Sequence, residues 1–299
     1  MGFHNRLYSL FGITINQNQL MSYKTGYPVG GPADYFVTVY SIDALISLVQ
    51  LCKEYEKPYK ILGNGTNVVF SDKGYRGVVI STKGLNSIAY KDGLVWAMSG
   101  VSLCDLVLFS AEYQLYGAEQ LVGIPASVGG AIVMNAGAFG KSIGDFVYEV
   151  VTLVDGKLKK YKNKDCVFGY RESTFVSSLE PIISATFKFE RNQTDTYDVD
   201  AVIARCRQRR KSDQPLGRSC GCIFKNPPND FAGRIIDSAS LKGLTVGGAS
   251  VSTKHANFII ANNGAKAQDI YQLVQQVKRK VKNEFGISLT EEVEFVGEF

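Results

Sequence analysis

The sequence lacks long apolar runs, a large excess of charge of one sign, and all but two histidines. No stretch approaches the roughly 20 consecutive apolar residues that span a bilayer, which predicts a protein without a membrane segment. Residues 1–6 also lack the apolar core of a signal peptide. A net charge of +5 falls short of the concentrated basic surface of a nucleic-acid binder. We therefore expect a cytoplasmic protein without a nucleic-acid partner.

The six cysteines are mostly scattered through apolar patterns, as is usual for reduced thiols in a cytosolic core. Cys220 and Cys222 are separated by one residue rather than two, which disfavours a zinc site. The two histidines, His4 and His255, lie far from each other in the sequence. We expect no bound metal.

Hydrophobic periodicity predicts an α+β protein of short strands with occasional helices. Residues 1 to about 20 are interpreted as a helix and a lead-in, and Ser41 is placed to cap the next helix. The clearest helix covers 267–285, where Gly286 supplies the stop. Further helices are expected at 102–115 and 195–211, and strands at 35–39, 59–62, 68–70, 77–80, 87–90, 94–98, 146–154, 182–189 and 257–261.

Two glycine-rich loops, 63–67 and 123–131, could present backbone amides to a pyrophosphate. The first departs from the Rossmann pattern, because a strand-like run replaces its third glycine, and neither has the Lys-Ser/Thr ending of a P-loop. Each loop alone is more typical of a tight turn than of a ligand cradle. Their occurrence together in one α+β half favours a dinucleotide held by loops from two subdomains.

The turn at 221–228 brings together a thiol, an ammonium and a carboxamide, from Cys222, Lys225 and Asn226. Its glycine allows close backbone approach, and its Asn-Pro step ends any regular element. A basic cluster at 205–211 precedes it. That cluster is either a solvated helix face or an anchor for an anionic ligand, and the sequence leaves both readings open.

Five motifs follow one another along the chain. They are 61–68 (ILGNGTNV), 123–131 with 134–140, 169–173 (GYRES), 221–227 (GCIFKNP) and 292–297 (EVEFVG). In this order they resemble the LGxGSNxL, GIPGxxGGA…MNAGAYG, YRxS, GSxFKNP and EVxxIG motifs of the UDP-N-acetylenolpyruvoylglucosamine reductase (MurB) family. The resemblance covers residues 25–297, and the short connection after Ser173 resembles the family's second subtype.

The resemblance implies a two-subdomain FAD-binding module of the vanillyl-alcohol-oxidase (PCMH) type at 25–194, split near residue 86. A smaller α+β substrate-binding domain would follow at 195–299, and residues 1–24 would be a lead-in. We expect a monomer. By motif, the substrate-binding residues are Tyr170, Lys225 and Asn226, and the cofactor-binding residues are Gly63, Asn64, Gly65, Thr66, Asn67, Gly123, Ile124, Pro125, Ser127, Gly129, Gly130, Asn135 and Gly137.

The reaction that the resemblance implies is part of peptidoglycan precursor synthesis. NADPH reduces FAD, and UDP-N-acetylglucosamine enolpyruvate then accepts a hydride from the flavin N5 to give UDP-N-acetylmuramate. By correspondence with the family motifs, Arg171 stabilises the enolate-like charge that develops on the enolpyruvyl carboxylate, and a protonated Glu292 donates a hydrogen bond to that carboxylate. Cys222 then supplies the proton.

Cys222 stands where the family usually has a serine as proton donor. A free cysteine thiol, with a pKa of about 8.5, is mostly protonated at neutral pH and is a stronger acid than a hydroxyl. We therefore interpret the exchange as a functional variant. Phe139 stands where a tyrosine is common, and Ala126 replaces a glycine. Two alternatives stay open: another FAD oxidoreductase of the same fold, and a nucleotide-sugar binding protein with impaired catalysis.

Overall fold

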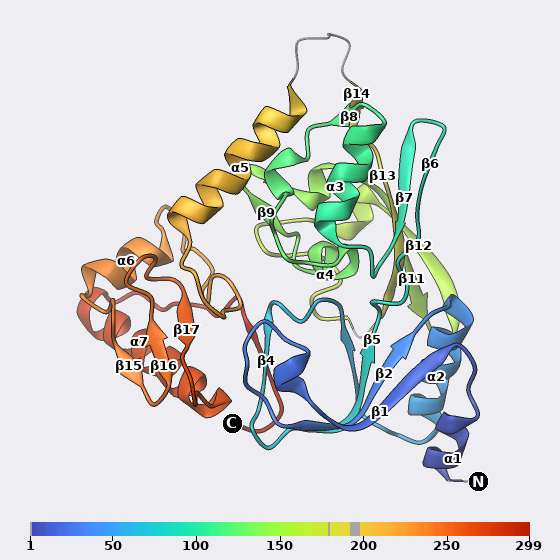
Figure 1. Cartoon of the computed structure of the whole chain (residues 1–299), viewed down its shortest axis with the longest axis horizontal. Coiled ribbons are helices and arrows are strands. Elements are labelled where there is room, and N and C mark those ends of the chain that lie inside the picture. The colour runs from blue at the N-terminus through green and yellow to red at the C-terminus, as the bar shows by residue number, and fades with distance from the viewer. Residues whose placement is uncertain (1, 179, 192–197) are drawn as a thin grey trace. The chain divides into compact units, whose positions relative to one another are not determined.

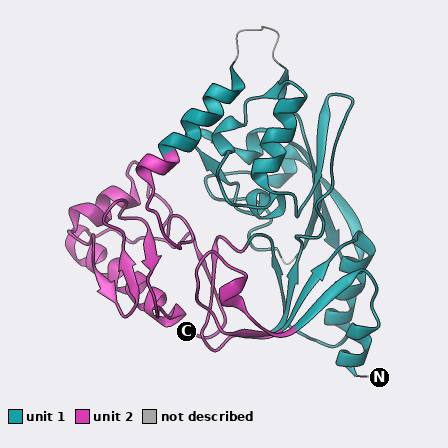
Figure 2. Ribbon diagram, in the orientation of Figure 1, with its two compact units in different colours: residues 1–16, 35–64, 77–209 teal, residues 17–34, 65–76, 210–299 magenta. Residues whose placement is uncertain are grey.

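The computed structural model describes residues 2–178, 180–191 and 198–299, and these form two compact units (Figure 2). Unit 1 comprises residues 1–16, 35–64 and 77–209, and unit 2 comprises 17–34, 65–76 and 210–299. The predicted domain boundary at 194/195 and the start of the predicted helix at 195–211 lie outside the described residues. The chain crosses between the two units within three strands, one loop and one helix, so both units are built from separate stretches of chain.

The first sheet has the strand order β1-β2-β5-β3 (Figure 1). Its strands are β1 (Ile13–Leu20), β2 (Pro32–Val39), β5 (Tyr75–Ser81) and β3 (Tyr59–Leu62), and it is accompanied by helices α1 (Phe3–Tyr8) and α2 (Ile42–Glu54). As predicted, Ser41 caps α2, because its Oγ accepts from the Ala44 amide at 3.1 Å. Leu45 and Leu48 of α2 share one buried cluster with Ile80 of β5.

The prediction for residues 1 to about 20 was wrong in its second half. A helix forms at α1, but the following residues form the eight-residue strand β1 instead of a lead-in. The alternation of Ile13 and Ile15 with polar residues is typical of a half-exposed strand. The Asn/Gln run that follows carries no apolar face, and its side chains are mostly exposed, which conceals the strand.

The second sheet, entirely within unit 1, is antiparallel and has the order β12-β11-β13-β7-β6. Helices α3 (Leu103–Glu112) and α4 (Val128–Val133) belong to its buried cluster, and α4 packs against β13 and β7. The hairpin partner β12 was not predicted, because its lysine-rich side chains are largely exposed. The strands are β6 (Ile88–Lys91), β7 (Leu94–Met98), β11 (Val147–Val154), β12 (Lys157–Lys162) and β13 (Ile182–Phe187).

Short elements complete unit 1. Strands β8 (Leu115–Tyr116) and β14 (Glu190–Arg191) form one pair, and β9 (Gly137–Ala138) and β10 (Lys141–Ser142) form another. The basic helix α5 (Val199–Asp213) begins in unit 1 and ends in unit 2. Its basic residues are mostly exposed, but the Arg209 guanidinium lies 4.6 Å from the ring centre of Phe139.

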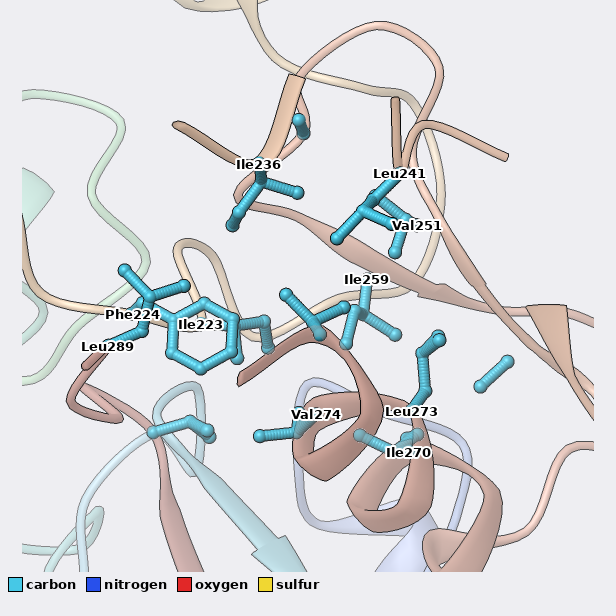
Figure 3. Close-up of a cluster of buried hydrophobic side chains, with 14 of the residues drawn as sticks. Ile223, Phe224, Ile236, Leu241, Val251, Ile259, Ile270, Leu273, Val274 and Leu289 are labelled. Carbon is cyan, nitrogen blue, oxygen red and sulfur yellow. The ribbon is translucent and has the colours of Figure 1, made fainter. Parts of the chain in front are cut away.

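Unit 2 is built around the long helix α7 (Ala267–Phe285), which has the predicted bounds. Gly286 ends it in the left-handed conformation at φ 71°, and Asp72 accepts from the amides of Ala267 and Gln268 at its start. Its apolar face packs into a core with the sheet β15-β16-β17 (Figure 3). The other elements are α6 (Ala232–Ser238), β15 (Thr245–Val246), β16 (Ala249–Val251), β17 (Ile259–Ala261) and the parallel pair β4 (Val68–Phe70) and β18 (Glu294–Val296).

Within the described residues, no helix combines the length and the apolar character needed to cross a membrane.

Candidate active site

The two glycine-rich loops meet inside unit 1. Gly63 follows β3, and a Cβ atom at this position would overlap the Oγ of Ser127 in the second loop. The next residue, Asn64, donates from Nδ2 to the carbonyl oxygen of Pro125 at 3.2 Å. Glycine is therefore required at position 63 for the loops to approach, and the structure brings together predicted cofactor-binding residues from both.

A continuous loop was predicted for 123–131, but helix α4 begins at Val128, so only the first half of this segment is a loop. The buried Ser127 caps this helix, accepting at Oγ from the Gly130 amide at 3.3 Å. The Gly129 amide donates to the Ser99 carbonyl at 2.8 Å, and a Cβ at Gly129 would lie 2.9 Å from the Ser99 Cβ. The amides of Gly129 and Gly130 therefore already have partners within the protein.

A cavity of about 330 Å³ adjoins Asn64 in unit 1. Asn64 and Asn86 supply carboxamides to its wall, and Lys83 and Asp105 supply charges of opposite sign. A volume of this size lies at the small end of ligand pockets, which fits part of a dinucleotide and not the whole. Its lining combines polar and apolar surface, and Asn64 connects it to the close-packed glycine loops. The remaining lining residues are Ile88, Gly100, Val101 and Ser102.

Asn135, a predicted cofactor-binding residue, has both ends of its side chain bound to the protein. Its Nδ2 donates to the Gly169 carbonyl at 2.8 Å, and its Oδ1 accepts from the Gly144 amide at 3.0 Å. Its backbone has a positive φ of 42°, which asparagine tolerates better than most residues. Asn135 thus ties the glycine-rich segment to the residue that precedes Tyr170 and Arg171.

Arg171 sits at the tip of a tight hairpin in which Gly169 and Glu172 pair with each other. Its φ of 55° is uncommon for a residue with a side chain. The guanidinium is fixed on two sides: Nη2 donates to the Gly137 carbonyl at 2.9 Å, and the group lies 5.2 Å from the ring centre of Tyr170. Backbone strain of this kind costs roughly 1–3 kcal/mol and is typical of functional sites.

In unit 2, the turn at 221–226 is bound on both sides by other segments. The Ile223 amide donates to the Asn257 carbonyl at 2.9 Å, and the Ile223 carbonyl accepts from the Glu292 amide at 2.7 Å. The Lys225 amide donates to the Thr290 carbonyl at 2.9 Å. The structure therefore brings two predicted catalytic residues together in unit 2, with Cys222 next to Ile223 in sequence and Glu292 hydrogen-bonded to it. Arg171, the third, belongs to unit 1.

Asn257 was missed by the sequence analysis, which placed it at the head of an apolar strand. Its side chain is 2% exposed, its Oδ1 accepts from the Phe224 amide at 2.9 Å, and its Nδ2 donates to the Phe224 carbonyl at 2.8 Å. The only signal in the sequence is a carboxamide directly before Phe258 and two isoleucines. A buried carboxamide needs such partners, because an unpaired one is costly.

Asn67 and Asn226 also have structural partners. Asn67 donates from Nδ2 to the Glu292 carbonyl at 3.0 Å, and its own carbonyl accepts from the Glu294 amide at 3.0 Å. Asn226 accepts at Oδ1 from the Ala232 amide at 3.0 Å, at the first residue of α6. Gly65, with a φ of 70°, accepts from the Gly26 amide at 2.9 Å. The second half of the 63–67 loop thus belongs to unit 2 and supports the C-terminal motif.

The two cysteines of the turn differ in environment. Cys220 is 4% exposed, and its Sγ lies 3.5 Å from the Val68 carbonyl as a hydrogen-bond donor. Burial raises the pKa of the Cys220 thiol to about 12. Cys222 is partly exposed. Of the two cysteines, Cys222 is therefore the less buried.

Comparisons with known proteins identify two domains in the chain. Residues 33–161 match the family model described as an FAD binding domain, and residues 211–296 match the C-terminal domain of UDP-N-acetylenolpyruvoylglucosamine reductase. These matches confirm the predicted α+β fold class and the predicted cofactor, FAD.

Relatives are similar over nearly the whole chain. UDP-N-acetylenolpyruvoylglucosamine reductase of Clostridium botulinum is 38% identical over 95% of this chain and 93% of its own length. The enzyme of that name from Listeria innocua is 39% identical, with 96% of each chain covered. The crystal structure of the MurB reductase from Thermus caldophilus has a TM-score of 0.81 at 34% identity and covers 95% of this chain and 100% of that one.

Proposed function

The chain belongs to the UDP-N-acetylenolpyruvoylglucosamine reductase family, and from this premise we propose that it reduces UDP-N-acetylglucosamine enolpyruvate to UDP-N-acetylmuramate with NADPH. FAD, when bound, supplies the hydride transfer between the two substrates. The observation that carries the assignment in this chain is the hydrogen-bonded placement of Cys222 and Glu292 about Ile223. It holds the backbone of a partly exposed thiol-bearing residue beside that of a carboxyl-bearing residue.

Cys222 holds the proton that is delivered to the substrate. The residue is partly exposed, and the backbone on its C-terminal side is fixed through Ile223. A protonated thiol can donate to the carbon next to the substrate carboxylate while charge develops on that carboxylate. The buried thiol of Cys220 has no such access, which supports the assignment of the proton to Cys222.

Arg171 stabilises the negative charge that develops on the enolpyruvyl carboxylate. A guanidinium fixed before the reaction begins costs no reorganisation when charge appears, and the Gly137 carbonyl and the Tyr170 ring fix this one. Glu292, held protonated, donates a hydrogen bond to the same carboxylate. Tyr170, Lys225 and Asn226 are proposed to orient the nucleotide sugar.

The domain assignment follows the motifs: residues 25–194 bind FAD, and residues 195–299 bind the nucleotide sugar. Among the proposed cofactor-binding residues, the geometry favours two roles. Asn64, Thr66, Gly123, Ile124 and Pro125 are proposed to approach the cofactor itself. Supporting roles, through close packing or internal hydrogen bonds, fall to Gly63, Gly65, Asn67, Ser127, Gly129, Gly130, Asn135 and Gly137. We further propose that the enzyme acts as a monomer in the cytoplasm, where NADPH is available.

The test is an assay of the purified flavoprotein with NADPH and the enolpyruvyl nucleotide sugar. Beyond the single equivalent that reduces the bound flavin, NADPH should be consumed in a one-to-one ratio with the enolpyruvyl nucleotide sugar, and mass spectrometry should show a product heavier by two hydrogens. Binding of the nucleotide sugar without NADPH consumption would instead identify a binding protein. Rapid NADPH oxidation coupled to a different acceptor would identify another flavin oxidoreductase.

A further inference from the structure

Asn257 pairs with both polar backbone groups of Phe224 through its carboxamide. The Phe224 amide donates to Oδ1 at 2.9 Å, and the Phe224 carbonyl accepts from Nδ2 at 2.8 Å. In an antiparallel sheet, a neighbouring residue exchanges the same two bonds through its backbone. The Asn257 side chain therefore takes the place of a strand partner for Phe224.

The backbone of Asn257 holds the preceding residue of the turn. Its carbonyl accepts from the Ile223 amide, and the Ile223 carbonyl accepts from the Glu292 amide. The Glu292 carbonyl in turn accepts from Asn67 Nδ2 at 3.0 Å. One row of hydrogen bonds thus crosses from Asn257 to Asn67, and it passes beside Cys222 and through the backbone of Glu292.

We infer that Asn257 is a positioning residue for the protonation step, because it fixes the backbone beside Cys222 and so sets the thiol relative to Glu292. This role rests on the proposed function, since only that reaction requires Cys222 and Glu292 to act together. Asn257 touches neither substrate nor cofactor in this role. It acts through Ile223 and Phe224.

Core packing alone does not hold the thiol in place. Ile223 and Phe224 are 0% and 2% exposed, and their side chains point into the core of unit 2 (Figure 3). Cys222, by contrast, is partly exposed. If the carboxamide were lost, the buried amide and carbonyl of Phe224 would be left without their partner, and the backbone would shift to satisfy them. Cys222, two residues earlier, would shift with it.

Asn257 is itself held from one side by His255. The backbone amide of Asn257 donates to His255 Nδ1 at 3.2 Å. Burial lowers the pKa of His255, which favours the neutral ring that can accept this bond. Lys242 and Asp213 are the charged groups that act on His255, with opposite effects on its pKa. The backbone at Asn257 is therefore held by His255 as well as by the turn.

The first test separates the two half-reactions in flavin-loaded Asn257→Ala protein. Reduction of the flavin by NADPH should stay within about threefold of wild type, because the turn need not move for it. Reoxidation by the enolpyruvyl nucleotide sugar should slow roughly 10- to 100-fold, the scale expected when a catalytic group is displaced. Equal slowing of both half-reactions, or reoxidation within twofold of wild type, would overturn the inference.

Asn163→Ala is the matched control. Asn163 also uses its carboxamide to bind backbone, donating to the Gly144 and Val147 carbonyls at 2.8 and 2.7 Å. It lies outside the proposed machinery. If loss of such a carboxamide acted only by general destabilisation, this variant would slow reoxidation to the same degree, and the inference would fail.

Asn257→Asp provides the second variant. An ionised carboxylate can accept from the Phe224 amide but repels the Phe224 carbonyl, whereas a protonated carboxyl can both accept and donate. The ratio of the reoxidation rates of this variant and wild type should therefore rise at least fivefold as pH falls and the introduced carboxyl becomes protonated. The alanine variant should show no such rise, and His255 titrates in all three proteins. A ratio independent of pH would contradict the pairing.

Amide hydrogen exchange distinguishes failure of this inference from failure of the proposed function. The amides of Ile223 and Phe224 should exchange at least tenfold faster in Asn257→Ala than in wild type, whatever substrate the enzyme uses. Unchanged exchange would overturn the positioning role. If the amides exchange faster in Asn257→Ala while the wild-type protein shows no turnover, the pairing stands and the proposed reaction is refuted.

Discussion

The Arg171 hairpin in unit 1 and the Cys222 turn in unit 2 hold their functional groups by different means. In the hairpin, a strained backbone presents a long side chain, and the fixing contacts are made by the guanidinium itself. In the turn, backbone pairing on both sides fixes the chain, and the short thiol is carried by it. A flexible side chain must be anchored at its charged end, whereas a short one is positioned by its backbone.

This difference predicts where each region is vulnerable. The hairpin should respond to changes in the side chain of Arg171 and to its neighbours Tyr170 and Gly137. The turn should respond to changes in residues that bind its backbone, such as Asn257, as well as to Cys222. The following experiments test this contrast, beginning with the largest expected effect.

Loss of the thiol should have the largest effect. Cys222→Ala should leave reduction of the flavin by NADPH intact and slow reoxidation by the enolpyruvyl substrate roughly 10²- to 10⁴-fold, the range for a lost general acid. Cys222→Ser should recover much of the rate, because a hydroxyl can replace the thiol as donor. Stopped-flow measurement of both half-reactions checks this. Normal turnover in the alanine variant would remove Cys222 from the mechanism.

Replacement of the guanidinium should rank second. Arg171→Lys keeps the charge but loses the planar fork that donates to the Gly137 carbonyl and lies over the Tyr170 ring, so reoxidation should slow roughly 10²-fold. Asn257→Ala should leave the orientation of Arg171 untouched. A lysine variant with unchanged kcat and unchanged KM would show that anchoring of the charged end is not needed.

Disturbing the close approach of the two glycine-rich loops should produce an intermediate effect. Gly63→Ala places a Cβ against Ser127 Oγ, which should lower the free energy of unfolding by about 1–3 kcal/mol, the usual cost of overpacking. The purified variant should also contain less bound flavin. Gly2→Ala is the matched control, because a Cβ there meets nothing within 4 Å and the φ of −73° suits a residue with a side chain. Equal thermal stability of the two variants would contradict the packing described for the loops.

The smallest effect should come from Cys220, whose pKa is raised to about 12 by burial. Because the folded-state pKa exceeds that of a free thiol, near 8.5, its contribution to stability is present below about pH 8.5 and is lost as pH rises toward 12. Iodoacetamide at mildly alkaline pH should therefore label Cys222 well before Cys220. Peptide mass spectrometry gives the order, and faster labelling of Cys220 would contradict its burial.

The sequence predicted most regular elements and the residues of the five motifs, because α7, α2 and β3 have clear periodicity and end signals. It did not predict α4, since two glycines at 129 and 130 disfavour a helix; burial of its apolar residues and the Ser127 cap outweigh that preference. Nor did it predict β1, where the apolar alternation covers only three residues.

The site was predicted less completely than the fold. The residues of the motifs could be found, but not what supports them, because the supporting contacts join distant positions. Asn257 lies 33 residues from Phe224, and Asn67 lies 225 residues from Glu292. Asn135 and Asn67, predicted as cofactor ligands, have side chains that bind other protein segments. A motif identifies which residues matter, but a carboxamide can serve a ligand or a backbone equally well.

The pH dependence of flavin reoxidation in wild type and Cys222→Ser tests the central claim most directly. If Cys222 delivers the proton, the wild-type rate should fall at alkaline pH as the thiol deprotonates. That decline should be absent in the serine variant, whose hydroxyl does not titrate in this range, while any effect of other groups should remain in both. An identical alkaline decline in the two proteins would show that Cys222 is not the proton donor.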